Sequence, residues 1–298
     1  MSGEFHHSRS FGIESFSALV FVVAIGVATL TAIPLRAASA DIATCDRLAA
    51  FPDDKDKPAD VKGSYDIAKT DVAAALKACK LAAAAPDVPR RINFELGRAF
   101  EFNGRNAEAV KAYRKAADAG STSAMIGLGT LLVNGNGLKT NPTEARMWFE
   151  KAANAGDVTG MTNLASIYGG GVGVPVDFAM ARSWFAKAAA ANSSEGMYQL
   201  GLMTQDGDGG TKDDGAAKAL FEKAASLDHG GALERLGAYA EAGRAGPKDE
   251  KAAIGFFKRA AALGSDDAVS ALKRLQCPFT MKDKQGKTAG SICFDCKN

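Results

Sequence analysis

A short pattern that recurs at a fixed spacing constrains this chain more than any other feature. The pattern is an aromatic residue, any residue, a basic residue and two alanines, and it occurs five times. Its basic residues are each 36 positions apart, at Lys115, Lys151, Lys187, Lys223 and Arg259. A register kept over successive steps is typical of repeat proteins, in which each unit buries its apolar face against its neighbours.

Other columns keep the same step. Small residues recur at Ala124, Gly160, Gly196, Ala232 and Ala268, and leucines at Leu128, Leu164, Leu200, Leu236 and Leu272. A small side chain lets two helix backbones approach closely, while leucines and aromatic residues fill the remaining space. The columns therefore predict helices that pack in register.

Each unit has the pattern of a helical hairpin, with helix A over residues 123–134, a glycine loop, and helix B over 142–155. Short polar residues that can cap helix B precede it at Asn141, Asp177, Asp213 and Asp249. Residues suited to the left-handed conformation follow it at Gly120, Gly156, Asn192, Asp228 and Gly264. These signals place helix boundaries at the same points in each unit.

The third unit resembles the Sel1-like repeat, a longer-looped relative of the tetratricopeptide repeat. The matching residues are Leu164, Tyr168, Gly171, Gly173, Val174, Asp177, Ala181, Trp184, Phe185, Lys187, Ala188 and Ala189. The unit departs at Ala165 and Asn192, where the family has glycine. The first unit is shorter, with 32 residues from Leu96 to Leu128, and resembles a plain tetratricopeptide hairpin. The resemblance implies an all-α, right-handed α-solenoid with capping helices and a short irregular C-terminal tail.

The ends of the chain divide into segments around five repeats at 90–264. Residues 41–89 are expected to form a strap and a capping helix (66–85), and residues 265–298 a capping helix and a cysteine-containing tail. We expect Cys45 to pair with Cys79. In the tail, Cys277 pairs with either Cys293 or Cys296, and a zinc site on these three thiolates is a less favoured alternative.

The N-terminus indicates export. Residues 16–35 carry no charge and are followed by Ala38-Ser39-Ala40, an A-x-A cleavage pattern. Residues 1–40 are therefore a signal peptide or, if uncleaved, a membrane anchor, and only residues 16–35 would contact the membrane. Either reading places the rest of the chain in the periplasm or outside the cell, where cysteines commonly form disulfides.

Charge and histidine content exclude several functions. With 36 basic and 34 acidic residues, the chain has no field that would attract nucleic acid. Two of the three histidines are His6 and His7, which leaves His229 alone for a catalytic triad or a histidine metal site. It lies beside a helix end, where a solvent-facing side chain is expected. We expect no cofactor and no bound metal.

Two further motifs are incomplete. Ser270-Ala271-Leu272-Lys273 matches the S-x-x-K pattern of penicillin-recognising enzymes, but the chain lacks their S-D-N and K-T-G motifs. The segment 206–214 resembles a calcium loop, but Ala217 occupies the twelfth position, where an EF-hand has glutamate. Both motifs are explained more simply by the repeat.

A partner surface is the remaining functional candidate. Columns of helix A that change between units do not serve one repeating core, so they are expected to face outward. In related solenoids helix A lines the concave face, which implies a protein- or peptide-binding groove there. The candidate residues are Arg91, Glu95, Arg98, Asn163, Ser166, Tyr198, Gln199, Glu234 and Arg235.

The sequence thus favours an exported, non-enzymatic adaptor of the bacterial cell envelope. The family resemblance adds a role in regulating envelope signalling or cell-wall and exopolysaccharide processes. The alternative is a β-lactam-hydrolysing or peptidoglycan-binding enzyme like the cysteine-rich Sel1-like proteins.

Overall fold

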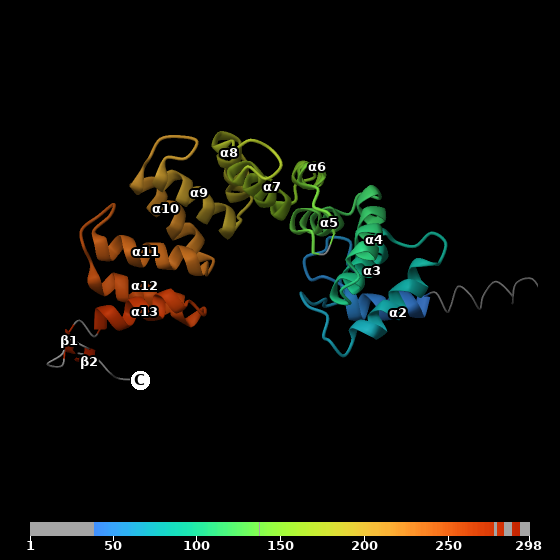
Figure 1. Cartoon of the computed structure of the whole chain (residues 1–298), viewed down its shortest axis with the longest axis horizontal. Helices are drawn as coiled ribbons and strands as arrows, with labels where there is room; N and C mark the ends of the chain where they lie inside the picture. Colours follow the sequence, from blue (N-terminus) through green and yellow to red (C-terminus); the bar gives the residue numbers. More distant parts are fainter. Residues whose placement is uncertain (1–38, 137, 277–278, 283–287, 293–298) are drawn as a thin grey trace, which may run out of the picture. The chain divides into compact units, whose positions relative to one another are not determined.

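The computed structural model describes residues 39–136, 138–276, 279–282 and 288–292 (Figure 1). The chain divides into two compact units, an N-terminal unit up to Arg105 and a C-terminal unit from Asn106 onward. Each unit has its own helices and core. The first predicted hairpin, which begins at residue 90, contributes one helix to each unit.

The C-terminal unit is a row of antiparallel hairpins in which each helix packs against the next along the chain. Its helices are α4 (Asn106–Asp118), α5 (Thr122–Asn134), α6 (Pro142–Asn154), α7 (Val158–Gly170), α8 (Phe178–Ala190), α9 (Ser194–Asp206), α10 (Asp214–Ser226), α11 (Gly230–Ala242), α12 (Glu250–Ala262) and α13 (Asp266–Gln276). The expected all-α solenoid is confirmed.

The helix ends follow the predicted signals. Asn141, Asp177, Asp213 and Asp249 each accept a hydrogen bond from a backbone amide in the first turn of helix B. The residues after helix B all have positive φ, from 55° at Asp228 to 93° at Gly264. Left-handed residues reverse the chain there, so each hairpin starts the next helix A in the same direction.

Small residues bring helix B of one unit against helix A of the next. A Cβ atom on Gly160 of α7 would lie 2.7 Å from the Ala153 amide nitrogen and 2.8 Å from the Ala152 Cβ of α6. Gly196 of α9 meets Ala188 and Ala189 of α8 in the same way, at 2.7 Å and 2.9 Å. The repeated alanines therefore belong to contacts that leave no room for a larger residue.

A second column of small residues accommodates the aromatic ring of helix B. A Cβ on Gly129 would lie 2.5 Å from the Phe149 ring, and Gly201 and Gly237 meet Phe221 and Phe257 at 2.5 Å and 2.7 Å. These rings are buried, with exposures of 3%, 0% and 5%. In these three hairpins, an aromatic ring of helix B thus packs against a glycine on helix A, and the α7–α8 hairpin has Ala165 at the equivalent position.

The N-terminal unit consists of a helix over residues 39–49, an irregular segment over 50–71 (called the strap below), α2 (Val72–Ala83) and α3 (Arg90–Phe102). The predicted Cys45–Cys79 disulfide is present and joins the first helix to α2. The capping helix begins at Val72 instead of residue 66.

The C-terminal tail contains a short antiparallel hairpin of β1 (Phe279–Lys282) and β2 (Thr288–Ile292), with Phe279 opposite Ile292. It is therefore more regular than the irregular tail that we expected. Cys277, Cys293 and Cys296 lie outside the described residues, as does the segment 16–35. Within the part of the chain that the structure describes, no helix combines the length and the apolar character needed to cross a bilayer.

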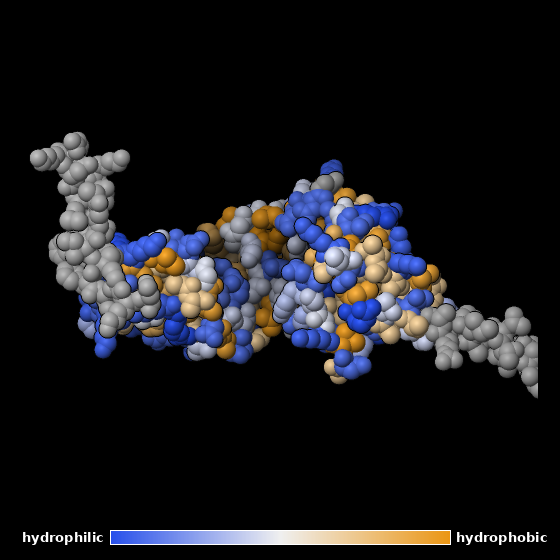
Figure 2. Space-filling model, turned by 90° about the horizontal axis from the view of Figure 1, so that it is seen from below, coloured by the Kyte–Doolittle hydropathy of each residue, from blue (hydrophilic) through white to orange (hydrophobic). Residues whose placement is uncertain are grey.

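The surface mixes polar and apolar residues. On the face seen in Figure 2, hydrophobic and hydrophilic residues are interspersed over the helices of both units. Exposed large apolar side chains include Met147 on α6 and Val176 and Phe178 at the start of α8. Isolated apolar residues are normal on protein surfaces, so a functional site has to be sought in a shaped feature instead.

We predict that Gly160→Ala destabilises the protein by about 1–3 kcal/mol, because the added methyl group forces the α6 and α7 backbones apart. Gly255→Ala on α12 is the matched control. A Cβ at Gly255 meets nothing within 4 Å, so alanine should stabilise that helix by about 0.5–1 kcal/mol. Urea unfolding followed by circular dichroism measures both effects. Equal effects of the two substitutions would show that the small-residue column does not set helix spacing.

Candidate functional site

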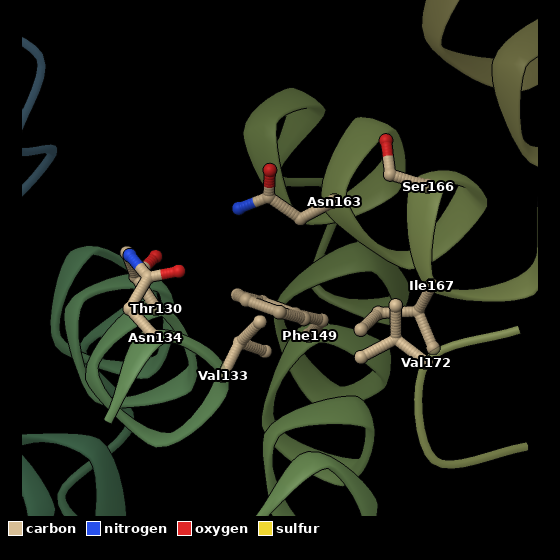
Figure 3. A pocket seen from close by; sticks show the side chains of 8 residues that line it. All are labelled: Thr130, Val133, Asn134, Phe149, Asn163, Ser166, Ile167 and Val172. Atoms are coloured by element: carbon tan, nitrogen blue, oxygen red, sulfur yellow. The ribbon is translucent and has the colours of Figure 1, made fainter. Parts of the chain in front are cut away.

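The candidate site is a pocket of about 210 Å³ between α5 and α7 (Figure 3). These two helices are helix A of successive units, so the pocket opens on the surface formed by the A helices, which we call the A face. Its lining consists of Thr130, Val133, Asn134, Phe149, Asn163, Ser166, Ile167 and Val172. The Phe149 ring comes from α6, the helix B that lies behind α5 and α7.

The lining separates into an apolar floor and a polar rim. The side chains of Val133, Phe149, Ile167 and Val172 gather at the floor, and Asn163 and Ser166 lie at the rim (Figure 3). No lining residue carries a charge. Apolar walls with a few polar groups at fixed positions are typical of binding pockets in proteins.

The pocket exists because small residues line the gap between α5 and α7. Ser166 belongs to a column in which the next unit has Leu202, which packs against the core around α9–α12. The neighbouring column has Thr162 on α7 and Tyr198 on α9. Tyr198 reaches from α9 to α11, where a Cβ on Gly231 would lie 3.0 Å from its ring. Larger side chains therefore fill the gap between α9 and α11.

The structure brings two predicted site residues together in this pocket. Asn163 is half-buried and Ser166 is exposed, and both come from α7. The Ser166 hydroxyl donates to the Thr162 carbonyl at 3.0 Å. The side-chain amides of Asn134 and Asn163 have no hydrogen-bond partner among the described residues. They are therefore available to bind a ligand.

Sequence reasoning missed the remaining six lining residues. Phe149 belongs to the repeated core pattern, which gives no sign that its ring also floors a pocket. Thr130 and Ser166 gave the one available signal, since they are small polar residues in a column where another unit has leucine. The size of the gap depends on which side chains of two successive repeats meet, and a single column of the repeat does not show these contacts.

Tyr198 and Gln199 belong to a different cluster on the A face. The Tyr198 ring stacks on the His229 ring, with centroids 4.5 Å apart. His229 Nε2 lies 3.0 Å from Glu195 Oε2, and Gln199 Nε2 donates to Glu195 Oε1 at 2.7 Å. The hydrogen bond with His229 lowers the pKa of Glu195, so its carboxylate stays ionised. Tyr198 is thus a packing residue as well as a surface residue.

His229 caps a helix, which corrects our expectation of a solvent-facing side chain. Its Nδ1 accepts a hydrogen bond from the Ala232 amide at 3.2 Å, at the start of α11. The equivalent caps of other units are Ser121, Asp157, Ser193 and Ser265. An accepting Nδ1 requires the proton on Nε2, which then donates to Glu195. This histidine therefore caps α11 and connects it to Glu195 of α9.

Glu234 and Arg235 lie together on α11. Glu234 is half-buried and Arg235 is exposed. Arg235 forms no ion pair among the described residues, so its charge is available on the surface. Both residues remain candidates for contact with a partner.

Three predicted groove residues are covered instead of exposed. On α3, Arg91, Glu95 and Arg98 were expected to extend the groove, but Glu95 and Arg98 are only 0% and 4% exposed. Arg91 forms an ion pair with Asp46 at 2.9 Å. The prediction that these residues meet a partner is corrected, because the chain's own N-terminal segment lies over them.

Glu95 on α3 is a buried acid beneath the N-terminal segment. Its Oε2 lies 3.1 Å from Cys45 Sγ, and its Oε1 has no hydrogen-bond partner. Burial raises the pKa of Glu95 to about 9, and the nearby Asp46 carboxylate raises it further. Glu95 therefore holds a proton at neutral pH, while Asp46 pairs with Arg91.

The structure places the residues of the other candidate motifs in structural contacts or on the surface. Cys45, Cys79 and Glu95 have the spacing of metal ligands, but both sulfur atoms are joined in the disulfide and do not bind a metal in that state. In the calcium-like loop, Asp213 caps α10 and Asp214 pairs with Arg244 at 2.6 Å. Ser270 and Lys273 are both exposed on α13.

Comparison with known proteins identifies the repeat. The Sel1 repeat family model matches residues 122–157, 158–193, 194–229 and 231–265. The chain contains four Sel1 repeats. The first three repeats begin at the first residue of α5, α7 and α9, and the fourth begins one residue after the start of α11. Each repeat therefore contains one helix A and the helix B that follows it. A search of the curated proteins found no significant match.

Solved structures support the same fold. A Sel1 repeat protein from Oxalobacter formigenes is 23% identical with a TM-score of 0.62, over 68% of this chain and 84% of that one. The protective antigen c5321 of uropathogenic Escherichia coli strains is 29% identical with a TM-score of 0.58. That match covers 68% of this chain and 44% of the antigen, so the chain spans less than half of its length. Sel1 repeats thus form the pocket on the A face.

We predict that Glu95→Gln stabilises the N-terminal unit increasingly as the pH rises from about 5 to 9. The folded pKa of about 9 exceeds the ordinary value of 4.5, so the folded state holds a proton that the unfolded chain releases. The stabilisation by Glu95 is therefore fully present below about pH 4.5. It decreases by up to about 1.4 kcal/mol per pH unit as the pH rises from about 5 to 9. A glutamine amide still donates a hydrogen bond to Asp46 but does not titrate, so the variant does not lose stability as the pH rises.

Hydrogen exchange of α3 peptides, compared between variant and wild type at each pH, measures this difference. The exposed Glu222 supplies the control, since Glu222→Gln should leave α3 protection unchanged at every pH. Equal protection of α3 in wild type and Glu95→Gln at pH 8 would contradict the assignment of a buried, protonated Glu95.

Proposed function

We infer that this protein is an exported, non-enzymatic scaffold of the cell envelope that binds a protein or peptide on the A face of its C-terminal unit. Sel1 repeats are a scaffold fold commonly used for protein–protein interaction. The observation that carries the proposal is the distribution of the repeat columns. The small residues and the aromatic rings that recur from unit to unit are buried between helices, whereas the varying residues Asn163, Gln199 and Arg235 lie on half-buried or exposed positions of α7, α9 and α11.

The accessible residues supply the mixed chemistry of a protein-binding surface. Asn163 and Gln199 provide amides, Arg235 provides a positive charge, and Glu234 a negative one. The pocket beside Asn163 adds an apolar depression of about 210 Å³. Protein interfaces combine such an apolar anchor point with a polar surround.

Export is supported by two features. The uncharged segment 16–35 and the A-x-A pattern that follows it suit a signal peptide or an anchor. The Cys45–Cys79 disulfide is consistent with a protein outside the cytoplasm, where thiols oxidise. A partner in the periplasm or at the cell surface follows, and regulation of envelope signalling or of cell-wall and exopolysaccharide enzymes is the role we propose.

We predict that Arg235→Glu weakens partner capture from an envelope extract at least fivefold, since reversing an exposed charge at an interface costs roughly 1 kcal/mol or more. Lys258→Glu, on the exposed side of α12, makes the same charge change away from the A face. Quantitative mass spectrometry of the captured proteins compares the two variants with the wild type. A partner that is lost equally with both variants, or with Lys258→Glu alone, would place the interface elsewhere.

A further inference from the structure

We propose that the pocket between α5 and α7 binds an extended polypeptide segment that inserts one large uncharged side chain over Phe149. The inference rests on the proposed function and names the chemical form of the partner at the A face. It follows from a binding arrangement that this chain already contains in its N-terminal unit.

The strap shows how an A helix of this protein holds a polypeptide segment whose backbone groups are not used up in a helix or a sheet. Residues 50–71 contain no helix or strand and pass over α3. The Arg98 guanidinium donates hydrogen bonds of 2.6–2.7 Å to backbone carbonyl groups of Ala49, Ser64 and Tyr65. A side chain of an A helix therefore binds the backbone of a segment that has no regular secondary structure.

The strap also provides an aromatic anchor. The Phe51 ring packs edge-on against Phe94 of α3, with centroids 6.3 Å apart, and lies 5.1 Å from the Arg98 guanidinium. Its contact thus combines an aromatic ring of the A helix with a polar side chain one turn away. The strap is thus held on α3 by one aromatic contact of Phe51 and by hydrogen bonds from Arg98 to backbone carbonyl groups.

The pocket of the C-terminal unit includes the helix A position that Arg98 occupies on α3, whereas its aromatic residue, Phe149, comes from helix B. The 32-residue step from Leu96 to Leu128 and the 36-residue step from Leu128 to Leu164 align Arg98 with Thr130 and Ser166. The same steps align Glu95 with Asn163. Arg98, which holds the strap on α3, therefore aligns with residues of the pocket rim on α5 and α7, whereas Glu95 lies against Cys45 of the first helix. No described segment of the chain covers the pocket.

The chemistry of the pocket selects an uncharged side chain. Its floor is made by Val133, Phe149 and Ile167, together with Val172. A charged group placed there would lose its hydration without meeting an opposite charge, since no lining residue is charged. An aromatic or large aliphatic side chain fits this floor, and an aromatic ring can pack edge-to-face on Phe149.

The rim favours an extended peptide over a helix or a lipid. The Asn134 and Asn163 amides each offer a donor and an acceptor. An extended segment has free backbone amide and carbonyl groups to pair with them, whereas a helix has already used its own. An acyl chain would fill the floor but would form no hydrogen bond with either amide.

The test begins with a phage-displayed library of random linear peptides selected on the purified full-length protein. We expect the enriched peptides to share one aromatic or large aliphatic residue flanked by uncharged residues. A synthetic peptide with the enriched sequence should bind by isothermal titration calorimetry, and replacing its large residue with alanine should weaken binding roughly tenfold or more. A fluorescent fatty acid is the second probe, and it should not bind.

Substitutions in one repeat column locate the binding. Ser166→Leu fills the pocket with the residue that the next unit carries at Leu202, so the fold should tolerate it. It should weaken the peptide roughly tenfold or more. Ala238→Leu, in the same column on α11, should leave the affinity unchanged. Asn163→Ala keeps the floor and should weaken binding several-fold through loss of the rim amide.

The outcomes separate this proposal from the broader one. If Ser166→Leu folds normally, by circular dichroism and thermal unfolding, and binds the peptide as well as wild type does, the pocket is not the anchor site. The proposal is also overturned if no peptide is enriched, or if the fatty acid binds and Ser166→Leu displaces it. Loss of partner capture with Arg235→Glu would still support the A face as an interface in each of these cases.

Discussion

The close contact between Gly160 and the backbone of Ala152 and Ala153 is the constraint on which the C-terminal unit depends. A Cβ at this position would lie 2.7 Å from a backbone nitrogen. Glycine therefore lets α7 approach α6 more closely than a residue with a side chain would. Gly196 repeats the contact one unit later, and alanines hold the equivalent position elsewhere. The spacing of these contacts sets the spacing of the A helices, and so the width of the gap that Phe149 floors.

The surface of helix A is covered in the N-terminal unit and accessible in the C-terminal unit. On α3 the strap covers the A helix, fixed by the carbonyl contacts of Arg98 and by the Cys45–Cys79 disulfide. On α5 and α7 the equivalent positions carry Thr130, Asn163 and Ser166, which are small and uncharged. A buried guanidinium needs several acceptors to offset its lost hydration, and the strap supplies them. Small neutral residues have no such requirement, so their surface can remain open.

The sequence predicted the helices, their caps and their order, because each follows from residues within one unit or from the 36-residue step. Asn141 and Asp177 cap their helices as the pattern indicated, and Asn192 and Asp228 take the left-handed conformation. The Cys45–Cys79 pair was also predictable, since both residues flank one polar loop.

The candidate site was less predictable because it depends on contacts between units and with the irregular strap. Nothing in α3 alone shows that Arg98 is buried, since its acceptors are backbone carbonyl groups with no sequence signature. Asn163 and Ser166 were found because their columns vary, but the role of Phe149 emerged only from the gap between α5 and α7. The capping role of His229 was missed because serine and aspartate usually occupy that position.

Excision of residues 158–193 tests most directly whether the 36-residue period is the structural unit that builds the A face. Asp157 would then cap α9, Gly196 would meet Ala152 and Ala153, and Leu202 would take the place of Ser166 beside Phe149. We expect a shortened protein that unfolds cooperatively in urea, with unchanged helix content per residue and a closed pocket. A shortened protein that is unfolded, or that melts without cooperativity, would contradict it.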